Sequence, residues 1–325
     1  MFVLDFTEPK WLILYYHVIG VLSINLNIFC IYLLQYQCKQ LEKFRYWIIA
    51  YQVGCFITDI IITVLMQPVP LYPLLACYTV GILSSWFDIQ PVYSCYIVCD
   101  FIAVQFVLLG VSFVKKHRTV SSLADSFAFP IQFDYLIFFF LIFGIVVGDL
   151  FAYSERLTEE EQWELIKEVV PNYVEGFRSL PNFEILPKSP FLIYSLFFVL
   201  FLGFLIIVIV FLLILDTFRK LHRLKRQLAP KNYERHAQGV RCLVVQVGTA
   251  GLSIFPIILL GISVLFEFPH SQLLSEFCIA WFATHSSFNM IALLIFFPPY
   301  KLFLQKHLSG LKSRINQERT SAISF

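Results

Sequence analysis

Polar side chains interrupt several long apolar stretches of this chain. Asp59, Asp100 and Asp149 each lie within such a stretch, as do Asn27 and Asn289. A charge held at mid-membrane costs about 2.5–3.5 kcal/mol on insertion scales, so these residues are functional candidates by default. We predict that Asp59, Asn27 and Asn289 converge in the inner half of a helical bundle and couple its two ends. The alternative is plain hydrogen bonding between helices, worth about 0.6 kcal/mol per contact.

Other residues extend this cluster into a predicted switch. Asn25 and Asn27 are two apart, so they point to different faces of one helix and do not easily join the same cluster. Pro256 removes a helix hydrogen bond and predicts a kink. Pro299 and Tyr300 follow the last apolar stretch, at a junction suited to deformation. The predicted switch comprises Asn27, Asp59, Asn289, Pro256, Pro299 and Tyr300.

A second acidic position suggests a ligand site. Asp100 follows Cys99, and two aromatic residues precede it by one and two helical turns. Its carboxylate could bind a cationic group of a small molecule in an outer cavity. We select the other residues of this predicted ligand site by their depth along the apolar stretches and by their side-chain chemistry. The predicted ligand-binding residues are Tyr93, Tyr96, Asp100, Trp281 and His285.

The elements that hold these residues are predicted to be membrane-spanning helices. Hydrophobic residues make up 58% of the 325 residues and charged residues only 14%, whereas a soluble domain carries about 25% charge. The apolar residues gather in runs of the length that a spanning helix needs, which is too long for barrel strands. The fold class is therefore all-α, a seven-transmembrane helix bundle. The runs lie at 11–35, 46–66, 90–114, 131–153, 191–215, 242–265 and 277–297.

Positive charge sets the predicted topology. With seven spans and the N-terminus outside, the inner segments hold 19 of the 24 Lys and Arg residues, as expected for cytoplasmic loops. An eighth span over the apolar stretch 68–86 would reverse that bias, and Pro68, Pro70 and Pro73 argue against a continuous helix there. Residues 67–89 are predicted to form an outer cap or a re-entrant segment.

The predicted outer face contains an acidic loop and cysteines. Residues 159–170 have helical periodicity, and Ser154 or Thr158 could cap that helix, which is either a solvated lid or part of a ligand pocket. Of the eight cysteines, most are expected to serve as small apolar residues. Cys77, Cys95 and Cys278 could reach the outer face, where either a Cys77–Cys95 or a Cys77–Cys278 disulfide is chemically allowed.

The predicted inner face is basic and amphipathic. Arg219, Arg223 and Arg226 are spaced for one face of a helix that continues the fifth span, beside a stripe of Leu221, Leu224 and Leu228. This stretch either anchors the chain to lipid headgroups or docks a cytosolic partner with an acidic amphipathic helix. After Pro298 and Pro299, the sequence predicts a short amphipathic helix in the membrane interface.

Three motifs resemble the nematode serpentine chemoreceptors, in particular the Srh and Sri classes of the Str superfamily. They are "QPVPLYPLLACYTVGIL" after the second span, "KNYERHAQGVRCLVVQVGTAGLSIFPI" entering the sixth, and "FFPPYKLFL" closing the seventh. The resemblance covers nearly the whole chain. It implies a chemosensory receptor in the plasma membrane, in sensory cilia, that signals through a heterotrimeric G protein.

The inner end of the third span departs from the pattern of rhodopsin-like receptors. It reads "FVKKHRTV" in place of Asp-Arg-Tyr. Arg118 would stand in for that arginine, with no adjacent acid to restrain it. The resemblance places the G-protein contacts at Arg118, Arg219, Arg223 and Arg226.

Other classes of function find little support. The histidines are scattered without an HExxH pattern, and no nucleophile elbow or phosphate-binding glycine loop occurs. We therefore expect no enzyme activity, no cofactor, no metal and no nucleic-acid partner. A ligand-gated ion channel and a small-solute transporter remain as alternatives. The predicted organisation is an external N-terminus (1–10), a receptor domain in contact with membrane lipids (11–313) and a cytoplasmic tail (314–325).

Overall fold

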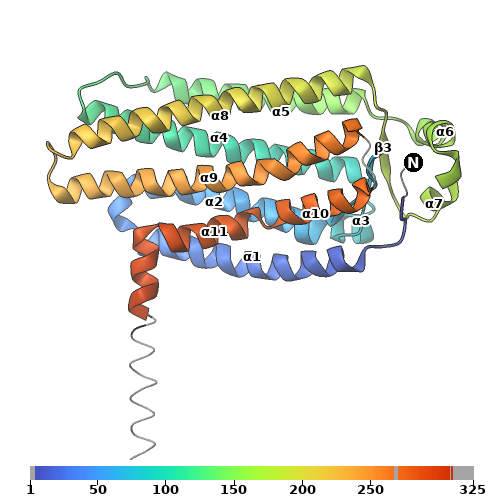
Figure 1. Cartoon of the computed structure of the whole chain (residues 1–325), viewed down its shortest axis with the longest axis horizontal. Coiled ribbons are helices and arrows are strands. Elements are labelled where there is room, and N and C mark those ends of the chain that lie inside the picture. Colours follow the sequence, from blue (N-terminus) through green and yellow to red (C-terminus); the bar gives the residue numbers. More distant parts are fainter. Residues whose placement is uncertain (1–3, 267–269, 308, 310–325) are drawn as a thin grey trace, which may run out of the picture.

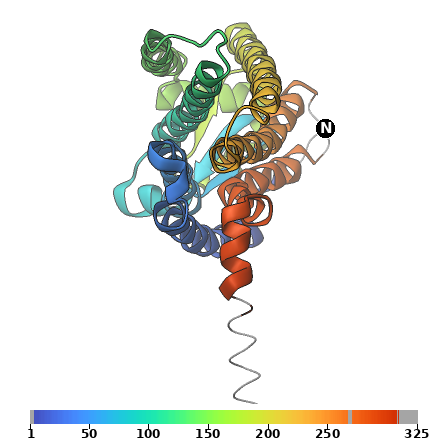
Figure 2. The same ribbon diagram turned by 90° about the vertical axis from the view of Figure 1, so that its left-hand side faces the viewer.

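Long helices packed side by side form the body of the molecule (Figures 1 and 2). The computed structural model describes residues 4–266, 270–307 and 309. Within these residues, seven helical segments run the length of the bundle. They are α1 (Lys10–Tyr36), α2 (Arg45–Ile60) continued by the π-helical turn η2 (Ile61–Met66), α4 (Pro91–Leu123), α5 (Gln132–Ser154), α8 (Pro190–Leu224), α9 (Pro230–Phe266), and the pair α10 (Ser271–Ala283) and α11 (His285–Phe296).

These segments have the length and composition of membrane spans. In the described part of the chain, five are long and apolar enough to cross a membrane, and the pair α10 and α11, bent by 46°, makes a sixth. The remaining segment, α8, is the longest apolar helix after α9. None of the apolar window of α5 is buried inside the protein, as expected of a helix that faces lipid. The predicted seven-helix bundle is confirmed.

Short elements close one end of the bundle, which we call the cap end (Figure 1). The predicted outer segment 67–89 forms a β-hairpin and a short helix. A strand from the acidic loop pairs with the hairpin, so that Leu75 lies opposite Leu186 in a three-stranded antiparallel sheet of order β1-β2-β3. The elements are β1 (Pro68–Pro70), β2 (Leu75–Thr79), α3 (Ile82–Phe87), α6 (Glu159–Val169), η3 (Pro171–Tyr173), α7 (Val174–Arg178) and β3 (Glu184–Leu186).

The cap has an apolar core of its own. Val69 of β1, Ile166 of α6, Phe177 of α7 and Ile185 of β3 are buried against one another. Thr158 begins α6 with a capping box, in which Thr158 and Glu161 each accept a hydrogen bond from the other residue's backbone N–H. This confirms the helix predicted at 159–170 and selects Thr158 over Ser154 as its cap.

The opposite end, which we call the basic end, is built from short connections. They are η1 (Lys39–Phe44) and residues 124–131 and 225–229. The helix that follows Pro298 runs across the bundle axis through residue 307 (Figure 1). The basic stretch 216–241 is mostly helix, because α8 and α9 extend beyond the apolar runs. Arg226 lies in the turn after α8 rather than on a face of that helix.

Gly81 sets how closely the hairpin approaches the end of η2. Its N–H donates to the carbonyl of Met66 at 3.0 Å, and a Cβ at this position would overlap the carbonyl oxygen of Leu65. We expect Gly81→Ala to lower the free energy of unfolding by about 1–3 kcal/mol, the usual cost of overpacking. Thermal unfolding of the purified receptor in detergent would measure this. Gly144→Ala is the matched control, since a Cβ there meets nothing; equal behaviour of both variants would contradict the packing argument.

Candidate functional site

Amide and hydroxyl side chains from four helices meet inside the bundle. Asn27 on α1 donates from Nδ2 to Ser286 Oγ on α11 at 2.9 Å, and its Oδ1 accepts a bond from Gln52 Nε2 on α2. Gln52 Oε1 accepts from Asn289 Nδ2 at 3.3 Å. Asn289 Oδ1 in turn accepts from Thr249 Oγ1 on α9 at 2.9 Å. Polar groups buried this deeply persist because they satisfy one another.

Asp59 joins this group through a serine. Ser23 Oγ donates to the carboxylate of Asp59, and Asn27 Nδ2 donates to Ser23 Oγ at 2.9 Å. Asn25 instead bonds to the carbonyl of Val21 on the exposed face of α1. The structure therefore brings together three of the predicted switch residues. We call the group the core polar network: Ser23, Asn27, Gln52, Asp59, Thr249, Ser286 and Asn289.

A branch of hydrogen bonds extends towards α4. Gln105 Nε2 donates to Thr58 Oγ1 on α2, and Gln105 Oε1 accepts from Cys55 Sγ at 3.3 Å. Cys55 Sγ also lies 3.9 Å from His285 Nε2. His285 is buried between these groups, and its Nδ1 has no partner among the described residues. Five long segments are thus linked through buried polar side chains.

The other predicted switch residues lie apart from the network. The Tyr300 hydroxyl lies 3.1 Å from Cys30 Sγ and donates to the Cys30 carbonyl at 3.4 Å. Its ring packs on Phe297 at the basic end. Pro299 is buried beside it, and Pro256 lies in α9, whose helical assignment continues through it. The prediction of one six-residue cluster is therefore corrected to a central network and a separate Pro-Tyr junction packed on α1.

An aspartate restrains Arg118 at the basic end. Arg118 contacts both carboxylate oxygens of Asp134, at 2.7 and 3.1 Å, and donates to the carbonyls of Phe129 and Pro130. Lys115 Nζ lies 2.8 Å from the same carboxylate. No acid next to Arg118 in the sequence restrains it, as expected, but Asp134 at the start of the next helix does.

A second aspartate links α4 to α8. Asp216 Oδ2 accepts from His117 Nε2 at 2.7 Å and from Lys220 Nζ at 2.6 Å. Lys220 also donates to Ser121 Oγ at 2.9 Å. Together with the contacts of Asp134, these bonds tie the basic end of α4 to both of its neighbours, α5 and α8.

The cationic face of α8 is free, whereas its leucine stripe is not. Arg219 and Arg223 on α8 are exposed, as is Arg226 in the following turn. Leu221 and Leu224 are buried against α4 and α9. The two leucines therefore hold the bundle together, and the exposed arginines are available to a partner or to lipid headgroups.

The predicted ligand residues are only partly brought together. Tyr93 and Tyr96 lie edge to face at the cap end of α4, with ring centroids 6.4 Å apart, and Asp100 is half-buried one turn further along. His285 is buried near the network. Trp281 does not point inward: it is 49% exposed on the outer face of α10. The structure therefore does not bring Trp281 together with Tyr93, Tyr96 and Asp100, because depth along a helix does not fix its helical phase.

Residues that the sequence analysis did not identify complete the group around Tyr93. Arg156 donates to the Tyr93 hydroxyl at 2.8 Å, lies over its ring, and binds the amide oxygen of Gln90. Its Nε lies 3.8 Å from Glu184 of β3. Burial raises the pKa of the Glu184 carboxyl, and Arg156 partly opposes that shift. Pairing across the cap depends on how β3 joins the sheet, which no local pattern reveals.

The cysteines in the described residues are all free. Neither of the disulfides that the sequence allows, Cys77–Cys95 or Cys77–Cys278, is formed.

Seven packed helices, a central polar network and charged contacts at one end define a seven-helix membrane receptor. The chain belongs to the Sri family: the family model described as serpentine type 7TM GPCR chemoreceptor Sri matches residues 2–304. It is thus a chemosensory G-protein-coupled receptor and a multi-pass membrane protein, of a class that is generally not enzymatic.

A solved structure shares this fold. The crystal structure of squid rhodopsin aligns with a TM-score of 0.54 and 11% sequence identity, over 94% of this chain and 90% of that one. Among curated proteins, no relative matches the chain.

Proposed function

We propose that the receptor lies in the plasma membrane of sensory cilia with its cap end outside and its basic end in the cytoplasm. The charge distribution supports this orientation, since 19 of the 24 Lys and Arg residues lie in the four sequence segments predicted to be cytoplasmic, three of which form the connections of the basic end. A small molecule binds at the cap half of the bundle, near Tyr93, Tyr96 and Asp100. A heterotrimeric G protein binds at the basic end, where Arg219, Arg223 and Arg226 are exposed.

The observation that carries the proposal is the core polar network. It connects α1, α2, α9 and α11 through buried hydrogen bonds, and its branch reaches α4, the helix that bears Tyr93 at one end and Arg118 at the other. Ligand binding can shift the balance of two arrangements only through different affinities for them. The arrangement seen, with Arg118 held by Asp134, is the one we assign to the resting receptor.

Topology and coupling can be tested in one cell line. The receptor would carry an epitope before Trp11 and a fluorescent tag after Phe325. We expect antibody to reach the epitope in intact cells, and an active compound from a screen of volatile and water-soluble molecules to dissociate the G protein. A hidden epitope would overturn the orientation. A ligand-evoked current in cells without G proteins would contradict the coupling.

A further inference from the structure

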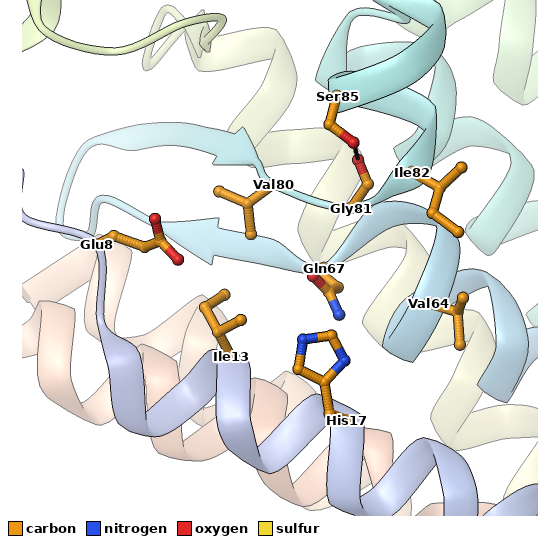
Figure 3. Close-up of a pocket in the computed structure, with 9 residues that line it drawn as sticks. All are labelled: Glu8, Ile13, His17, Val64, Gln67, Val80, Gly81, Ile82 and Ser85. Carbon is orange, nitrogen blue, oxygen red and sulfur yellow. Dashed lines mark hydrogen bonds between the residues drawn. The ribbon is translucent and has the colours of Figure 1, made fainter.

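A cavity of about 340 Å³ lies at the cap end, beside the start of α1 (Figure 3). It is open to the surface and is lined by residues from the start of α1, the end of η2, the end of β2 and the start of α3. None of the predicted ligand residues lines it. Its size is at the lower end of small-molecule sites. The lining residues are Glu8, Ile13, His17, Val64, Gln67, Val80, Gly81, Ile82 and Ser85.

Three polar groups of this cavity have free acceptor atoms, and they lie beside His17, whose neutral ring has one donor and one acceptor nitrogen. Glu8 offers a carboxylate that makes no ion pair with any residue of the described chain. Gln67 donates from Nε2 to the Thr63 carbonyl at 2.9 Å, so its Oε1 remains to accept. Ser85 uses its proton on the Gly81 carbonyl, at 3.0 Å, and keeps its lone pairs. No lysine or arginine lines the cavity. A ligand that donates hydrogen bonds, and above all a cation, matches this set.

The remaining wall is aliphatic, and His17 points into the cavity from α1, towards Gln67 (Figure 3). On either side of His17, Leu14 and Val18 are exposed on the face of α1 that meets lipid. Trp86 of α3 is 78% exposed beside the cavity, and tryptophan gathers at membrane–water interfaces. The cavity therefore sits at the boundary between water and hydrocarbon, with Glu8 at one end and an apolar wall along the rest.

We propose that this cavity is a second ligand site, which binds an amphiphile with an amine or ammonium headgroup and a short alkyl chain. The headgroup donates to Glu8, at one end of the cavity. The chain packs on Ile13 and Val64. The amine comes either from a free alkylamine or from the headgroup of a phosphatidylethanolamine, and both offer the same chemistry to the site.

The test uses the full-length receptor in maltoside micelles and an octylamine that carries a photoreactive diazirine. We expect labelled peptides to map to residues 8–17, 64–67 or 80–85, and unlabelled octylamine to compete. Glu8→Gln should reduce labelling about tenfold, because a charge-assisted hydrogen bond is lost. Glu159→Gln, at an exposed acid on α6 of the same cap, should keep full labelling. Asp100→Asn is a separate arm, which reports amine binding at the bundle site.

Phosphatidylethanolamine added to the micelles separates the two sources: competition identifies the lipid headgroup, and no competition identifies a free amine. The proposal is overturned if Glu8→Gln labels as strongly as the unaltered chain, or if the octanoate analogue labels the same peptides equally well. Loss of labelling in Asp100→Asn, with labelling kept in Glu8→Gln, would assign amine binding to the bundle site instead.

Discussion

Asp134→Asn is expected to raise ligand-independent nucleotide exchange on the G protein by about tenfold. The carboxylate of Asp134 holds Arg118 through two contacts and Lys115 through a third. Hydrogen bonds to charged groups contribute about 1.5–3 kcal/mol each, and 1.4 kcal/mol is a tenfold change in an equilibrium. Asparagine keeps one acceptor oxygen but loses the charge. Arg118 then leaves the carbonyls of the connecting loop more readily, and the basal population of the active arrangement rises.

The measurement is binding of a non-hydrolysable GTP analogue in membranes that contain matched amounts of receptor and G protein. Asp125→Asn is the control, because Asp125 lies in the same connection but is exposed. Asn tolerates the left-handed backbone at that position as Asp does. Asp216→Asn should also raise basal exchange, since it releases α8 from α4. Unchanged basal exchange in Asp134→Asn at normal surface expression would show that the contact is structural only.

The seven spans could be predicted because lipid imposes a strong rule. Each span must satisfy its own backbone hydrogen bonds, so a run of about 20 apolar residues specifies a helix with few alternatives. The Pro298–Pro299 break was equally readable, since proline cannot continue a helix that needs its N–H. Both predictions depend on local chemistry alone, and the structure agrees with both.

The cap sheet could not be predicted in the same way. β2 pairs with β3, which lies about 110 residues further along the chain, and a short strand has no stability until its partner is in place. The proline-rich segment was recognised as something other than a span, but its hairpin depends on that distant pairing. The contact between Arg156 and Glu184 could not be predicted for the same reason, because it depends on where β3 joins the sheet.

Several polar residues could be recognised from their type, but the residues that they contact could not be predicted. Asn27, Asp59 and Asn289 stand out in apolar runs, whereas Gln52, in an equally apolar run, was not selected although the same rule applies to it. The neighbours of Arg118 in the sequence include no acid, and Asp134, which restrains it, is sixteen residues away. Trp281 was selected from depth and side-chain chemistry without a face, and helices exposed to lipid on one face do not show the polar stripe that would fix their phase in a soluble protein.

Asn27→Ala is expected to reduce ligand-driven G-protein activation at least about tenfold and to lower the free energy of unfolding by about 1–3 kcal/mol. The side chain bridges α1 to α2 and α11, and its loss leaves Gln52 Nε2 without its acceptor. Asn25→Ala is the matched control: it makes the same chemical change two residues away, at a side chain that bonds only to its own helix. A surface change of that kind alters stability by less than about 0.5 kcal/mol.

The pair of variants separates a switch from simple helix-to-helix bonding. If the network only holds helices together, Asn27→Ala loses stability and ligand binding in parallel, and a low-temperature assay of the surviving receptor restores full signalling. If the network couples the two ends, ligand affinity changes little while G-protein activation falls, because only the transition between arrangements has lost its connection. Binding and activation measured on the same membranes therefore decide the role of the network. Asn25→Ala fixes the baseline, since a comparable loss there would mean that amides on α1 matter to folding rather than to coupling.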